Sequence, residues 1–122
     1  MILDVATRGV APDITVFELK GRLALGNRLT EAEHLIKSAI AGGCRKLVLD
    51  LDGLEFIDSA GVGLLVMCAG GMEQAGGRLC VTSGNRKIAH VFEITHLERV
   101  VTLHPNAESA CQSLGADTAA AG

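Results

Sequence analysis

The chain has 122 residues, of which 48% are hydrophobic and 20% are charged, and these proportions are typical of one folded globular domain. The 11 Lys and Arg residues are scattered and are outnumbered by 14 Asp and Glu residues, and Trp and Tyr are absent, so nucleic-acid binding is disfavoured. No apolar run is long enough to span a bilayer, and Asp4 and Arg8 interrupt the N-terminal segment where a secretion signal needs an apolar core. We therefore expect a cytoplasmic protein without a membrane partner.

The N-terminal half predicts strands and one helix. Residues 14–19 are rich in β-branched and apolar side chains, and residues 2–6 can pair with them as an edge strand. Apolar residues recur at helical spacing across residues 27–41, and Gly42 and Gly43 supply a helix stop. Residues 46–51 form a short apolar run that is typical of a strand covered on both faces.

The C-terminal half continues the alternation of strand and helix. An apolar helical stretch runs to Gly76 and Gly77, and strands are predicted at 78–82 and 100–103 with helices at 86–94 and 106–114. This order predicts a single α/β domain at residues 1–114, with a mixed, mostly parallel sheet of about five strands and about four helices. Residues 115–122 hold no large apolar anchor and are expected to fray.

The cysteines show no pattern of a metal or redox site. No C-x-x-C spacing occurs among Cys44, Cys68, Cys80 and Cys111. Free cysteines in apolar surroundings behave as small buried hydrophobes, and this is the role that we expect for them. The sequence therefore predicts no metal ion and no cofactor.

Ser59 lies where the predicted strand 46–51 and its polar continuation give way to a helix. Backbone N–H groups at the start of a helix point into solvent and favour an anion, so the hydroxyl of Ser59 is expected to be exposed beside these donors. Gly61 and Gly63 carry no side chains that would obstruct a ligand or a partner.

Four interpretations of this segment compete. A phosphate-binding P-loop is excluded because no lysine follows the second glycine, and a hydrolase nucleophile elbow is excluded because Ile57 stands where glycine is required. A phosphorylation switch at Ser59 remains open. So does a purely structural role, in which Asp58 or Ser59 caps the helix.

The run KLVLDLDGLEFIDSAGVGLL at residues 46–65 resembles the signature of STAS domains, especially of the anti-anti-sigma factors, which are anti-sigma factor antagonists. The similarity extends to GRL at 21–23, GGRL at 76–79 and ITHL at 94–97, and so covers roughly residues 10–114. The resemblance implies a STAS-type α/β fold and a regulatory protein rather than an enzyme.

The resemblance also implies a mechanism of regulation. In the family, the serine of the D-S-x-G motif is phosphorylated by a partner anti-sigma factor that is itself a serine kinase. The unphosphorylated form binds that partner and liberates a sigma factor. Ser59 would thus be the phosphate acceptor, Asp58 and Gly61 would shape its loop, and a phosphatase would restore the hydroxyl. One departure is Ala24, where many members have an aspartate.

A helical-wheel count at about 100° per residue divides the helix after Ser59 into two faces. The face expected to be core contains Leu64, Leu65, Cys68, Met72 and Ala75. The other face carries Glu73 and Gln74 but also the apolar or small residues Val62, Gly63, Val66 and Gly70. Because contiguous apolar exposure usually marks interaction, we expect Asp58, Ser59 and Gly61 to continue into this face as one partner-binding surface.

Two other functions stay open at this point. One is a constitutive STAS scaffold in a signalling assembly, which uses the same helix face without phosphorylation. The other is a nucleotide-binding STAS domain. The second is disfavoured because the sequence shows no pair of base and nucleophile and no metal constellation.

Overall fold

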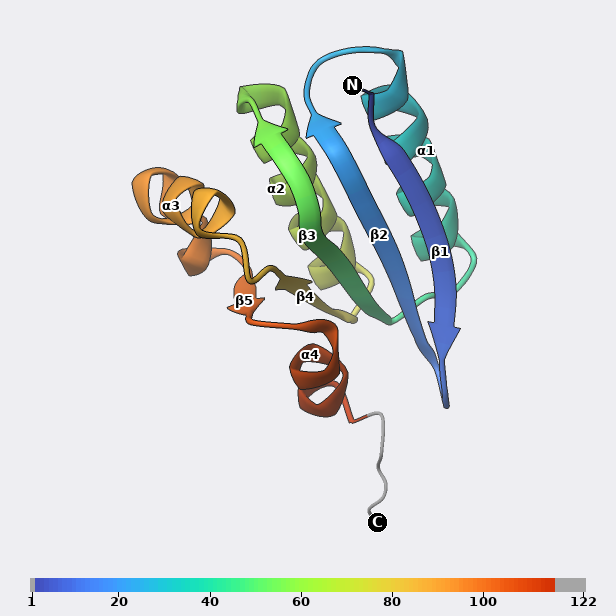
Figure 1. Cartoon of the computed structure of the whole chain (residues 1–122). Helices are drawn as coiled ribbons and strands as arrows, with labels where there is room; N and C mark the ends of the chain where they lie inside the picture. Colours follow the sequence, from blue (N-terminus) through green and yellow to red (C-terminus); the bar gives the residue numbers. More distant parts are fainter. Residues whose placement is uncertain (1, 116–122) are drawn as a thin grey trace.

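Five strands form one sheet, and their order in space is their order in the chain (Figure 1). They are β1 (Asp4–Val10), β2 (Ile14–Leu23), β3 (Lys46–Ile57), β4 (Arg78–Thr82) and β5 (Thr102–His104). β1 pairs antiparallel with β2, and the other neighbouring strands are parallel. The computed structural model describes residues 2–115, and the α/β fold with a mixed, mostly parallel five-stranded sheet is confirmed. The tail at 116–122, for which fraying was predicted, lies outside the described residues.

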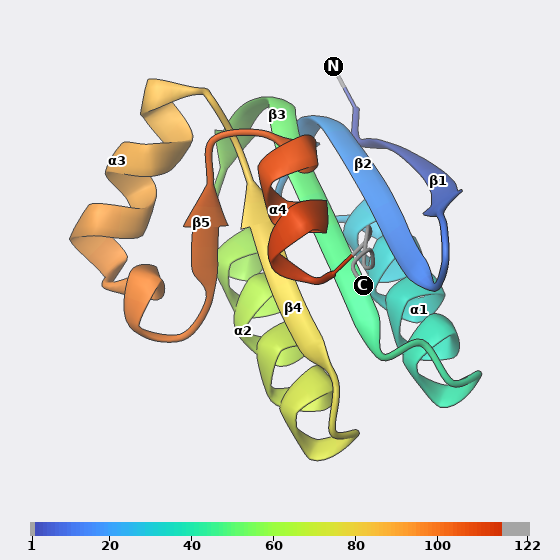
Figure 2. The same cartoon turned by 90° about the horizontal axis from the view of Figure 1, so that it is seen from below.

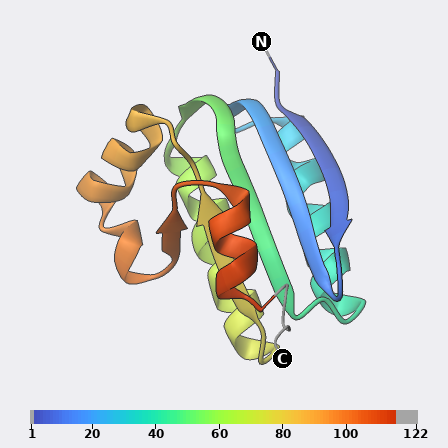
Figure 3. The ribbon, with the colours of Figure 1, turned by 60° about the horizontal axis from the view of Figure 1, so that its bottom comes forward.

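Helices cover both faces of the sheet. They are α1 (Asn27–Ala41), α2 (Ser59–Gln74), α3 (Arg86–Thr95) and α4 (Ala107–Ser113), and a short 3₁₀ turn, η1 (Leu97–Arg99), follows α3. Figures 2 and 3 show α1 and α2 behind the sheet and α4 in front of it. The larger core lies under α1, α2 and α3, and a smaller one lies between α4 and the opposite face of the sheet. No helix within residues 2–115 is long and apolar enough to cross a membrane.

β2 and β3 extend several residues beyond the apolar runs that predict them. The sequence indicates a strand that ends at residue 51, but β3 continues through Asp52, Gly53 and Glu55 to Ile57. The reason is the partner strand, because β2 pairs with β3 as far as Leu23↔Ile57, with register shifts that absorb the irregular segment. Pairing of the backbone therefore overrides the polar side chains, and it brings the ends of both strands to the start of α2.

The remaining boundaries differ from prediction by a few residues. β1 covers residues 4–10 rather than 2–6, because it pairs with β2 over its whole length from Asp4↔Lys20 to Val10↔Ile14. β5 begins at Thr102 rather than at residue 100, because η1 and the bond from the Val100 amide to the Leu97 carbonyl keep the chain in a turn. Asn85 caps α3, since its Oδ1 accepts a hydrogen bond from the Lys87 amide. Asn106 caps α4 in the same way, through the Ser109 amide.

Candidate functional site

Ser59 is the first residue of α2 and is exposed to solvent at the carboxyl end of β3. Its hydroxyl forms no hydrogen bond with any other described residue. The hydroxyl is therefore both accessible and uncommitted, which fits an acceptor of a chemical group better than a residue that holds the fold together.

Asp58 performs the capping role that the sequence left open between Asp58 and Ser59. Its backbone is extended, and its Oδ1 accepts a hydrogen bond of 2.9 Å from the Gly61 amide. Its Oδ2 accepts a second bond of 3.0 Å from the amide of Leu25 in the loop between β2 and α1. The amides of Leu25 and Gly61 lower the pKa of Asp58 below its ordinary value, because they stabilise the charged carboxylate.

The tight packing around the start of α2 explains Gly61. A Cβ at this position would overlap the carbonyl oxygen of Leu23 and come within 2.8 Å of the Ile57 side chain. Gly61 is buried and lets β2 and α2 approach each other, so its missing side chain makes room for β2 rather than for a partner, which differs from the prediction. Space for a partner lies instead at Gly63, where an added Cβ would meet no atom within 4 Å.

The two faces of α2 lie much as the helical wheel predicts. Leu64, Leu65, Cys68 and Met72 are at most 4% exposed, and Ala75 is half-buried. On the other side Gly63 and Gly70 are exposed, and Val66 is 44% exposed. Val62 differs from the prediction, because it is half-buried and packs against the main core. The outward apolar surface of α2 therefore centres on Val66.

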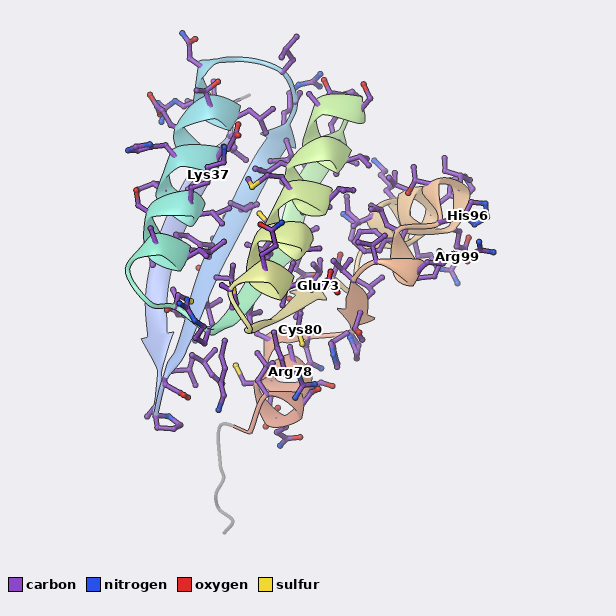
Figure 4. The ribbon with its side chains drawn as sticks, turned by 180° about the vertical axis from the view of Figure 1, so that it is seen from behind. Lys37, Glu73, Arg78, Cys80, His96 and Arg99 are labelled. Carbon is purple, nitrogen blue, oxygen red and sulfur yellow. The ribbon has the colours of Figure 1, made fainter. Side chains whose placement is uncertain are left out.

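A groove continues this surface toward the C-terminal end of α2. It has a volume of about 640 Å³, and Val66 and Gly70 line it together with Arg99 and Val100. Figure 4 shows Glu73 near the end of α2 and Arg99 on the segment after α3. No local sequence pattern predicts the groove, because α2 forms one side of it and residues about 30 positions later form the other.

A second surface beside Ser59 was also missed by sequence reasoning. The loop between β2 and α1 exposes 82% of Leu25, and Phe56 at the end of β3 is 40% exposed. The guanidinium of Arg22 lies 4.0 Å from the centre of the Phe56 ring. The bond from the Asp58 amide to the Leu23 carbonyl (3.2 Å) joins this loop to the start of α2. Nothing in the sequence distinguishes Leu25 from a core leucine.

The cysteine thiols lie away from this surface. Cys68, Cys80 and Cys111 are buried and Cys44 is half-buried, and all four are free. Burial raises the pKa of Cys68 to about 12 and raises the pKa values of Cys80 and Cys111 as well. Residues 2–115 contain no group of three or more His, Cys, Asp or Glu side chains that could hold a metal ion.

The chain and its fold resemble those of known proteins. A candidate anti-sigma factor antagonist of Thermotoga maritima is 23% identical over 105 residues, which are 86% of this chain and 93% of that protein. The crystal structure of an anti-sigma factor antagonist from Mycobacterium paratuberculosis superposes with a TM-score of 0.80 at 19% identity, covering 93% of this chain and 94% of that one.

The Bacillus cell fate determinant SpoIIAA in its phosphorylated form superposes with a TM-score of 0.72 at 22% identity, covering 90% of this chain and 98% of that one. The TM-scores of these two structures show that they share the fold of this chain. Residues 7–110 match the family model of the STAS domain, which is most of the chain and includes the whole of the Ser59 site. The chain therefore belongs to the STAS domain family.

Proposed function

We propose that this protein is an anti-sigma factor antagonist controlled by phosphorylation of Ser59. With Ser59 unmodified it binds an anti-sigma factor in the cytoplasm, and a sigma factor is released. The anti-sigma factor is also the serine kinase that modifies Ser59, and a phosphatase reverses the modification. The protein itself acts as a regulator and not as an enzyme.

One observation carries this proposal: the Ser59 hydroxyl is exposed and has no structural task, because Asp58 already caps α2. The names of the relatives from Thermotoga maritima and Mycobacterium paratuberculosis support the role of antagonist. SpoIIAA, which has the same fold, is known in unphosphorylated and phosphorylated forms.

The chemistry needs only the hydroxyl from this chain. Ser59 Oγ forms a bond to the γ-phosphorus of ATP while the bond from that phosphorus to the β–γ bridging oxygen breaks. ADP leaves, and the hydroxyl proton passes to a base of the kinase. In the reverse direction, water attacks the phosphorus, and inorganic phosphate leaves with the Ser59 hydroxyl restored.

The start of α2 can hold the added charge without unfolding. A phosphoserine carries about −1.5 to −2 charges at pH 7, and the N-terminal end of a helix stabilises such a group. Outside the domain the same charge repels an acidic partner surface. The apolar surface around Val66 and Gly70 is the second part of the proposed binding surface, and it is exposed in the unmodified chain.

Mass spectrometry of the intact protein isolated from its native cell tests the switch directly. A phosphate-sized increase that phosphatase removes, localised to Ser59 by fragmentation, is the expected result. If the isolated protein never carries phosphate under any growth condition, the switch is wrong. A constitutive STAS scaffold that binds through the Val66 surface then becomes the better account.

A further inference from the structure

Between its two ends, the exposed loop at Leu25 is held by one hydrogen bond to a described residue. Among the described residues, the only hydrogen bond made by Ala24 or Leu25 runs from the Leu25 amide to Asp58 Oδ2. The Leu25 side chain is 82% exposed and so contributes little packing. The other backbone bonds of the loop are at its ends, where the Leu23 carbonyl accepts from the Asp58 amide and the Gly26 carbonyl accepts from the Thr30 amide.

The same carboxylate serves α2. While Asp58 Oδ2 holds Leu25, Asp58 Oδ1 holds the Gly61 amide, so both oxygens are engaged. Hydrogen bonds to a charged acceptor are roughly twice as strong as those between neutral groups. The loop at Leu25 and the first turn of α2 therefore both depend on one charged side chain, and this side chain is adjacent to Ser59.

A phosphate on Ser59 would disturb this arrangement in two ways. Its negative charge repels the neighbouring carboxylate, and its oxygens compete with Asp58 for the Gly61 amide in the first turn of α2. The Gly61 amide can exchange one anionic acceptor for another. The Leu25 amide lies outside that helical turn, and Asp58 Oδ2 is its one acceptor among the described residues.

We propose that Asp58 couples the two segments, so that phosphorylation of Ser59 releases the Leu25 amide and frees the loop that presents the Leu25 side chain. The switch then withdraws an apolar contact in addition to placing a charge. This inference rests on the proposed function, but it concerns a conformational step inside this chain.

The surface around Leu25 indicates what the partner presents there. Arg22 and Arg28 line a hollow of about 380 Å³ beside Leu25. Arg22 stacks on Phe56 and forms no ion pair with a described residue, and Arg28 reaches Glu31 only at 4.0 Å. This chemistry fits an apolar socket on the anti-sigma factor with acidic side chains at its rim.

Amide hydrogen exchange measured by NMR on the whole chain tests the coupling. Phosphoserine is installed at position 59 during translation, so that the kinase is not needed. The expected result is an increase of about tenfold or more in the exchange rate of the Leu25 amide, which is the effect of losing a bond to a charged acceptor. The Lys87 amide, which the Asn85 side chain caps at 2.9 Å, should keep its rate and serves as the internal control.

Two substitutions complete the test. Asp58→Asn should raise the exchange of Leu25 without phosphate. Asn85→Ala removes the cap of the Lys87 amide and a bond to the Leu54 carbonyl, and it should raise the exchange of Lys87 while leaving that of Leu25 unchanged. Leu25→Ala should weaken binding of the unphosphorylated chain to the purified anti-sigma factor about tenfold or more, whereas Leu35→Ala, at an exposed leucine of α1, should not.

An unchanged Leu25 exchange rate in the phosphorylated chain overturns the coupling. The proposed function is unaffected by that result, because phosphate could still block binding by its charge alone. Conversely, a faster Leu25 amide with equal partner affinity in both states would reject the proposed function and retain the conformational step.

Discussion

Substitution of Gly61 and of Gly63, two residues apart in α2, should change the stability of the domain in opposite directions. A methyl group at Gly61 overlaps the Leu23 carbonyl, whereas one at Gly63 meets nothing within 4 Å. Gly61→Ala should therefore destabilise the domain by about 1–3 kcal/mol, which is the usual range for overpacking. Gly63→Ala should stabilise it by up to about 1 kcal/mol, because alanine favours a helix over glycine. Urea unfolding of both variants measures the difference, and equal stabilities would contradict the packing of α2 against Leu23.

The Asp58 carboxylate predicts an acid-sensitive contribution to stability. Amides of Leu25 and Gly61 hold the pKa of Asp58 below its ordinary value in the folded protein. A carboxyl group with a lowered pKa stabilises the fold above its unfolded pKa, and this contribution is lost as the pH falls through the folded value. The free energy of unfolding should thus decline below about pH 4, and less steeply in Asp58→Asn. Urea unfolding at a series of pH values between neutral and acidic tests this. If the free energy of unfolding fell equally with pH in both proteins, Asp58 would not be the source of the acid sensitivity.

At the scale of elements, the two faces of α2 predict different effects of a charged substitution. Val66→Lys should leave the free energy of unfolding within about 0.5 kcal/mol of the wild type, as substitutions at exposed positions do. Its binding to the anti-sigma factor should fall sharply, because an interface core tolerates an unpaired charge poorly. Leu65→Lys, one residue earlier on the buried face, is the matched control and should unfold the domain. A Val66→Lys chain that fails to fold would show that the two faces of α2 are reversed.

The cysteines report how tightly α2, β4 and α4 are packed. Cys68, Cys80 and Cys111 should react slowly with a thiol reagent in the folded protein, and the half-buried Cys44 should react first. All four should react promptly after unfolding in guanidinium. Stoichiometric reaction of four thiols in the native state would mean that α4 does not stay docked on the sheet.

The sequence predicted the elements better than it predicted their contacts. The alternation of strand and helix and the DS-x-G segment are local patterns, and they placed the sheet, α2 and Ser59 correctly. The extension of β3 to Ile57 was missed, because it depends on pairing with β2 and not on the side chains of Asp52 to Glu55. The same limit applies to the site, since the bond from Leu25 to Asp58 joins positions 33 residues apart and no local pattern signals it.

For the whole molecule, the central claim is that one phosphate on Ser59 turns binding off while the fold persists. The partner needed for this measurement is the anti-sigma factor, identified by co-purification from the native cell and then purified. We expect the folded state to carry the phosphate, because helix N-terminal amides stabilise an anion. We expect the interface to reject it, because like charges across an interface cost several kcal/mol, roughly a hundredfold or more in affinity.

Calorimetric titration of that partner with the wild type, Ser59→Ala and the phosphoserine-59 protein tests this claim most directly, with circular dichroism as the control for folding. We expect comparable tight binding for the wild type and Ser59→Ala. The phosphorylated protein should give an unchanged spectrum and an affinity at least about a hundredfold lower. Equal affinities for the phosphorylated and unphosphorylated proteins would contradict the switch.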